Sequence, residues 1–60
     1  MDTLYDALIF IVDDDVVSID MMQAVLAKKG FKSIVSFADA REGLEAAFRE
    51  KPDLIILDIV

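Results

Sequence analysis

Two short segments of the chain are apolar without interruption: ALIFIV at residues 7–12 and LIIL at residues 54–57. A strand with one face in water alternates apolar and polar residues, so an unbroken apolar run of this length indicates a strand that is covered on both faces. Such strands are typical of parallel sheets that carry helices on each side. This feature constrains the fold most, because the residues between the two runs must then supply the covering helices.

The segment after the first apolar run predicts an amphipathic helix. Asp15 is placed to cap a helix that extends to about Lys29, because its carboxylate can accept hydrogen bonds from the free N–H groups of the first turn. Gly30 then suits the left-handed conformation in which many helices end. At helical spacing, the apolar stripe expected to face the sheet consists of Ile19, Met22, Val25 and Leu26.

A second strand and a second helix are predicted next. Residues 32–37, KSIVSF, are short and more polar, as expected of a strand at the edge of a sheet. Asp39 and Glu42 have the spacing of a capping box that begins a helix, and Pro52 ends that helix. The stripe that this helix is expected to bury consists of Leu44, Ala47 and Phe48.

The predicted order of strand, helix, strand, helix, strand gives an α/β fold with a three-stranded parallel sheet and right-handed crossovers. If the first strand lies in the centre, the helices cover both faces, and we treat residues 1–60 as one domain. The third strand then has a single neighbour, although its sequence is that of an interior strand. A chain of 60 residues buries only about 60% of its unfolded surface, so a lone monomer has little margin of stability.

Composition excludes several classes of function. The chain has no cysteine and no histidine, which removes disulfides, thiolate chemistry, histidine acid–base catalysis and most zinc sites. Metal sites built from oxygen ligands remain open, as does oligomerisation. The net charge of −6 argues against nucleic acid or an anionic membrane as the main partner. No apolar run is long enough to cross a bilayer and residues 1–6 do not resemble a secretion signal, so we expect a soluble cytoplasmic protein.

Carboxylates follow two strands of the predicted sheet. Asp13, Asp14 and Asp15 come directly after the first strand, and Asp58 ends the third. Ligands of open parallel sheets bind outside the carboxyl ends of the strands, and neighbouring strands lie about 4.8 Å apart, so these side chains can converge. A hard divalent cation would relieve their mutual repulsion, and a set of oxygen ligands suits magnesium. Read singly, these aspartates fit a solvated turn, a strand end and, for Asp15, a helix N-cap.

The stretch IFIVDDDVVSIDMMQAVLAKKGF, together with SFADAREGLEAAFREKPDLIILDIV, resembles the N-terminal half of a bacterial response-regulator receiver domain. The shared features are the acidic pair after the first strand, the KPDLIILDI context, and an aspartate 44 residues beyond the second member of that pair. The resemblance implies a flavodoxin-like fold and a place in two-component signalling. The protein is then a phosphoacceptor rather than an enzyme, and its partner is a sensor histidine kinase.

The resemblance also implies a role for each site residue. Asp58 corresponds to the phosphoacceptor, which also ligates Mg²⁺. Asp14 is similar to the direct magnesium ligand, and Asp13 to the ligand that acts partly through water. The backbone carbonyl of Val60 corresponds to a main-chain ligand of the metal. A carboxylate nucleophile fits this chemistry, because the cation neutralises charge on the transferred phosphoryl oxygens.

Receiver domains continue beyond the third strand, whereas the sequence stops at Val60. We therefore expect a fragment, or a truncated or engineered half, of a receiver domain. The alternative function for the isolated chain is a self-associating half-domain without phosphotransfer activity of its own. Its homodimer would form through an exchange of elements or through pairing of the third strands, at Leu54, Ile55, Ile56 and Leu57.

Two other families fit the sequence less well. A phosphatase of the haloacid-dehalogenase type needs a D-x-D-G-T-like loop, and Asp13 and Asp15 have its spacing, but Val16 and Val17 stand where glycine and threonine are required. A dinucleotide-binding fold needs glycines after the first strand. Gly30 and Gly43 are the only glycines, and neither lies there.

Overall fold

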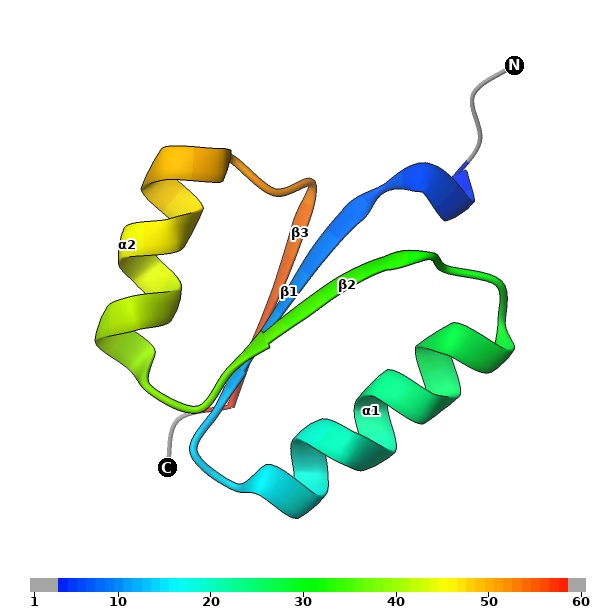
Figure 1. Ribbon diagram of the computed structural model, residues 1–60, viewed down its shortest axis with the longest axis horizontal. Coiled ribbons are helices and arrows are strands. Elements are labelled where there is room, and N and C mark those ends of the chain that lie inside the picture. The colour runs from blue at the N-terminus through cyan, green and yellow to red at the C-terminus, as the bar shows by residue number, and fades with distance from the viewer. Residues whose placement is uncertain (1–3, 59–60) are drawn as a thin grey trace.

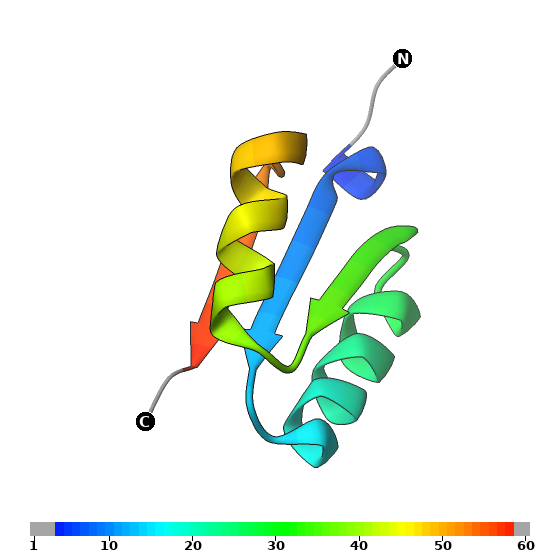
Figure 2. The same ribbon diagram turned by 60° about the vertical axis from the view of Figure 1, so that its left-hand side comes forward.

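Three parallel strands lie at the centre of the computed structural model, which describes residues 4–58 (Figure 1). The order of the strands in the sheet is β2-β1-β3, so the first strand is central. Figure 2 shows that all three strands end at the same edge of the sheet, beside the starts of the two helices. The elements are η1 (Leu4–Asp6), β1 (Leu8–Asp13), α1 (Val16–Lys28), β2 (Ser33–Phe37), α2 (Ala40–Glu50) and β3 (Leu54–Asp58).

The central strand β1 carries the core. Its side chains at Ile9, Phe10, Ile11 and Val12 are almost entirely buried. The helices α1 and α2 lie on opposite faces of the sheet, and each contacts β1 (Figure 1). The predicted α/β fold with a three-stranded parallel sheet and helices on both faces is therefore confirmed, and this arrangement is consistent with part of a flavodoxin-like fold.

Both predicted helix starts are confirmed by their caps. The Asp15 carboxylate accepts a hydrogen bond from the N–H of Val17, and the Asp39 carboxylate accepts bonds from the N–H groups of Arg41 and Glu42. Gly30 follows α1 with a φ of 108°, in the left-handed region that was expected for it. These are local interactions, which explains why they can be predicted from neighbouring residues.

The predicted buried stripe of α2 is wrong for two of its three residues. Leu44 is 44% exposed and Phe48 is 83% exposed, while Gly43 and Ala46 are the buried positions of this helix. The cause is close packing: a Cβ added to Gly43 would lie 2.7 Å from Cγ2 of Val12. The helix therefore meets the sheet with its smallest residues, and its larger apolar side chains turn toward β3.

The same correction applies in part to α1. Ile19 is buried as predicted and Met22 and Leu26 are partly buried, but Val25 is 53% exposed. Apolar residues lie on more than one side of this helix, so periodicity alone gives a poor guide to the side that meets the sheet.

A short 3₁₀ turn precedes β1 and was not predicted. The Tyr5 ring in this turn packs on the Phe31 ring, with ring centroids 5.2 Å apart. The backbone carbonyl of Tyr5 accepts a hydrogen bond from the N–H of Lys32. The turn thus joins the beginning of the chain to the loop between α1 and β2. Within residues 4–58, no helix has the length and apolar character needed to cross a membrane.

Candidate functional site

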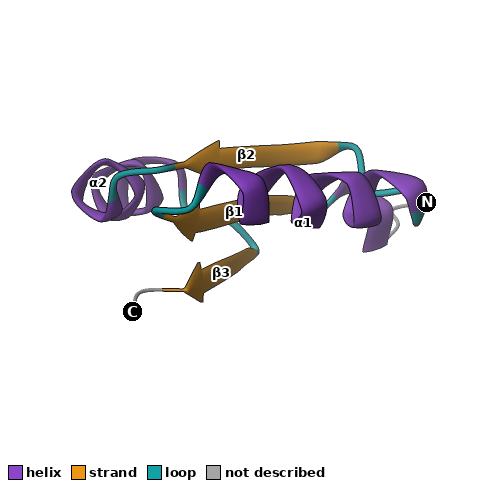
Figure 3. Ribbon diagram, turned by 90° about the horizontal axis from the view of Figure 1, so that it is seen from below, coloured by secondary structure: helices purple, strands orange, loops and turns teal. Residues whose placement is uncertain are grey.

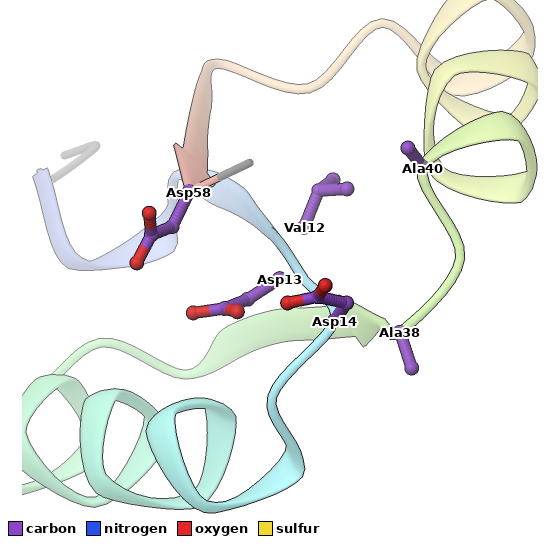
Figure 4. Close-up of a pocket in the computed structure, with 6 residues that line it drawn as sticks. All are labelled: Val12, Asp13, Asp14, Ala38, Ala40 and Asp58. Atoms are coloured by element: carbon purple, nitrogen blue, oxygen red, sulfur yellow. The ribbon is translucent and has the colours of Figure 1, made fainter. Parts of the chain in front are cut away.

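The carboxyl ends of β1 and β3 form one side of a small pocket. Its volume is about 120 Å³. The pairing of the strands places Asp13 and Asp58 opposite each other as register partners. Figure 3 shows β1 and β3 side by side and pointing the same way. Figure 4 shows that the pocket is lined by Val12, Asp13, Asp14, Ala38, Ala40 and Asp58. Three of the four aspartates singled out in the sequence, Asp13, Asp14 and Asp58, are therefore brought to one pocket by the sheet.

Asp13 is the buried member of this group, with 3% of its surface exposed. Its Oδ1 accepts a hydrogen bond of 2.9 Å from the backbone N–H of Asp15. Its Oδ2 is buried and has no hydrogen-bond partner among residues 4–58. A buried carboxylate oxygen without a partner is unfavourable, so this atom is suited to a cation that enters the pocket.

Asp14 and Asp15 follow Asp13 in the chain but have different roles. Asp14 is exposed and lines the pocket. The Asp15 carboxylate is instead used as the N-cap of α1, where it also accepts a 3.1 Å hydrogen bond from the Ser18 hydroxyl. The run of three aspartates therefore supplies two carboxylates to the pocket and one to the helix.

Asp58 reaches the pocket from the end of β3 and is exposed to solvent. Its carboxylate is thus accessible from outside the molecule, whereas its register partner Asp13 is not. This difference suits a pair in which one carboxylate reacts and the other binds.

The three carboxylates border the pocket without forming a closed ligand set. Among residues 4–58, no group of three or more aspartate, glutamate, histidine or cysteine side chains lies close enough together to hold a metal ion. The expected main-chain ligand at Val60 lies outside the described residues. Carboxylate oxygens are the type of ligand that magnesium prefers, and the Oδ2 of Asp13 has no hydrogen-bond partner among residues 4–58.

Two alanines of the pocket were missed in the sequence. Ala38 follows β2 and Ala40 begins α2, so both reach the same edge of the sheet as the aspartates. Between them, Asp39 uses its carboxylate to cap α2. Small side chains leave space in front of the carboxylates, and their position directly after a strand was the signal that could have identified them.

Residues 9–60 match the response regulator receiver domain family. The match begins inside β1 and covers most of the chain, including every aspartate of the pocket.

Two curated proteins of Bacillus subtilis (strain 168) are similar to the chain. The transcriptional regulatory protein YvrH is 40% identical over 55 residues, which are 92% of this chain and 23% of YvrH. The alkaline phosphatase synthesis transcriptional regulatory protein PhoP is 36% identical over 52 residues, 87% of this chain and 21% of PhoP. The chain thus spans less than a quarter of the length of these relatives, and no solved structure matches it significantly.

Proposed function

The chain belongs to the response regulator receiver domain family, and from this premise we propose that Asp58 is the phosphoacceptor of a two-component phosphorelay. The observation that carries the proposal is the position of this residue. Asp58 is an exposed carboxylate at a strand end, in a pocket whose other acidic residues come from the neighbouring strand. A sensor histidine kinase is the proposed phosphoryl donor, and the cytoplasm is the proposed location, as is typical of response regulators.

The proposed reaction is a nucleophilic displacement at phosphorus. An oxygen of the Asp58 carboxylate forms a bond to phosphorus while the bond between phosphorus and the histidine ring nitrogen of the donor breaks. The electron pair remains on that nitrogen. The exposure of Asp58 permits the approach of the donor, and the alanines at positions 38 and 40 leave room for the phosphoryl group.

We further propose that Asp13, Asp14, Asp58 and the backbone carbonyl of Val60 hold Mg²⁺. When bound, the ion supplies positive charge that offsets the negative charge of the phosphoryl oxygens and carboxylates. The Oδ2 of Asp13, which has no hydrogen-bond partner among residues 4–58, supports this proposal, since a buried oxygen needs a positive or hydrogen-bonding partner. Asp13 is held in place by the N–H of Asp15, which fixes its carboxylate at the edge of the pocket.

Phosphorylation by a small phosphoramidate, followed by intact-mass analysis, tests the assignment. We expect Mg²⁺-dependent labelling that is weak in the isolated 60-residue chain and absent in Asp58→Asn. Asp14→Ala should weaken Mg²⁺ binding and should reduce labelling by roughly 100-fold or more, the usual scale for the loss of an electrostatic element of a site. Asp20→Asn, which removes an exposed acid of α1 outside the pocket, is the control. Unchanged labelling of Asp58→Asn would contradict the proposal.

A second candidate function is self-association, and the exposed apolar surface around β3 favours it. Within residues 4–58, β3 pairs only with β1, and Leu54 and Leu57 are 49% and 51% exposed. The exposed side chain of Phe48 lines an adjoining groove between α2 and β3. An unpaired apolar edge is a template for another chain, so the proposed homodimer joins two β3 strands about a two-fold axis through residues 54–57.

A further inference from the structure

Asp53 makes two hydrogen bonds to one residue at the end of the sheet opposite the pocket. Its backbone N–H donates to the Leu8 carbonyl at 2.9 Å, and its Oδ2 accepts from the Leu8 N–H at 2.8 Å. Asp53 directly precedes β3, and Leu8 is the first residue of β1. These two hydrogen bonds therefore join β1 and β3 at the point where their pairing begins.

No neighbouring residue of the chain could replace Asp53 in this pair of hydrogen bonds to Leu8. Pro52 has no N–H to donate, and Leu54 has no side-chain acceptor. The nearest other carboxylates, Glu50 and Asp58, are three and five residues away. Both bonds to Leu8 can therefore form in only one alignment of β3 against β1.

The apolar residues of β3 do not specify that alignment by themselves. Residues 54–57 are all leucine or isoleucine, and they pair with the continuously apolar residues 9–12 of β1. A slip of β3 by one or two residues would still place mostly apolar residues opposite apolar ones. Register is weakly specified where the pattern of a strand does not change on slipping, so a polar anchor is needed to fix it.

The alignment decides whether the pocket exists. In the observed register, Leu54 pairs with Ile9 and, four residues on, Asp58 pairs with Asp13. A slip of two residues would move Asp58 by about 6.6 Å along the sheet, because each strand residue advances about 3.3 Å. The Asp58 carboxylate would then no longer lie beside Asp13.

We propose that Asp53 is a positioning residue that sets the register of β3 and thereby places Asp58 beside Asp13. The chemical consequence, for metal and phosphoryl binding, rests on the proposed function. The structural consequence does not, because the register can be measured without any ligand.

The experiment compares variants by NMR and by Mn²⁺ binding, with Mn²⁺ in place of Mg²⁺. In Asp53→Ala we expect fast amide exchange at Leu8, loss of the native cross-strand contacts between Ile11 and Ile56, and roughly 10-fold weaker Mn²⁺ binding, as for a lost supporting partner of a metal ligand. Asp53→Asn keeps an oxygen acceptor at the same reach, so it should restore all three. If Asp53→Ala does not fold, Asp53→Glu, which displaces the carboxylate by one methylene, should show the same changes to a smaller extent.

Tyr5→Ala is the matched control. Tyr5 lies near the same end of the sheet but packs on Phe31, beside β2 rather than β3. This variant should lose thermal stability while it keeps the Ile11–Ile56 contacts and the Mn²⁺ affinity. The proposal is overturned if Asp53→Ala, or its glutamate replacement, retains the native register, or if Tyr5→Ala weakens Mn²⁺ binding to the same extent. Absence of Mn²⁺ binding in the unmodified protein would reject the proposed metal site instead, and the register measurement would still decide the role of Asp53.

Discussion

The strands β1 and β3 are built from almost the same residues, LIFIVD and LIILD, yet they occupy opposite environments. Every residue of β1 from Ile9 to Asp13 is buried, while the residues of β3 are exposed or only partly buried. The difference comes from their neighbours. Within residues 4–58, β1 has a strand on each side and a helix on each face, whereas β3 has one neighbouring strand, β1, and only partial cover from α2.

This comparison shows that an apolar sequence predicts a strand but does not determine how deeply that strand is buried. It also explains how two aspartates at equivalent strand ends acquire different properties. Asp13 is buried because β1 is central, and Asp58 is exposed because β3 is not. Three pairs of substitutions test this contrast.

The largest expected effect concerns the cores of the two strands. Ile11 and Ile56 are register partners of the same type, but Ile11 is fully buried and Ile56 only partly so. Ile11→Ala should lower the free energy of unfolding by about 3–5 kcal/mol, the upper range for a buried isoleucine, and Ile56→Ala by about 1–2 kcal/mol. Since a small domain has roughly 3–5 kcal/mol in total, Ile11→Ala should be largely unfolded. Circular dichroism shows whether Ile11→Ala is folded in water, and a urea titration gives the loss of stability in Ile56→Ala. Equal losses of stability in the two variants would contradict the contrast.

A smaller effect is expected at the edge of β3. Leu54→Lys places a charge in the proposed dimer contact and should raise the dimer dissociation constant by roughly 10-fold or more, about 1.4 kcal/mol. Val25→Lys adds the same charge at a similarly exposed site on α1 and serves as the control. Light scattering over a concentration series gives the dissociation constants. Equal effects of the two lysines, or a monomer at all concentrations without either change, would remove β3 as the contact.

The smallest effect is expected at the strand tips. Without divalent cations, Asp13→Asn should stabilise the fold by about 1 kcal/mol, because it removes a buried charge whose Oδ2 has no partner among the described residues. Asp58→Asn, at an exposed site, should change stability by less than about 0.5 kcal/mol. Thermal unfolding in a chelating buffer measures this difference. A loss of stability in Asp13→Asn under these conditions would show that the buried charge is satisfied.

Part of this protein could be predicted from local sequence. The helix caps at Asp15 and Asp39, the left-handed Gly30 and the strands within the apolar runs depend on residues close in the chain, so each was found. The acidic pair and Asp58 were also identified, because parallel strands that end in carboxylates bring them to one edge of the sheet.

The packing of these elements against one another could not be predicted in the same way. Periodicity placed Leu44 and Phe48 on one face of α2, but the sheet contacts Gly43 and Ala46, because the absence of a side chain at Gly43 lets the helix approach Val12 closely. The sequence predicted the cap at Asp15 but gave no indication that Asp13 would be buried with an Oδ2 that has no hydrogen-bond partner among residues 4–58. The hydrogen bond between Asp53 and Leu8 could not be predicted from the sequence either, since the two residues are 45 positions apart and meet only after the strands have paired. Sequence patterns report on neighbours in the chain, whereas burial and register are set by neighbours in space.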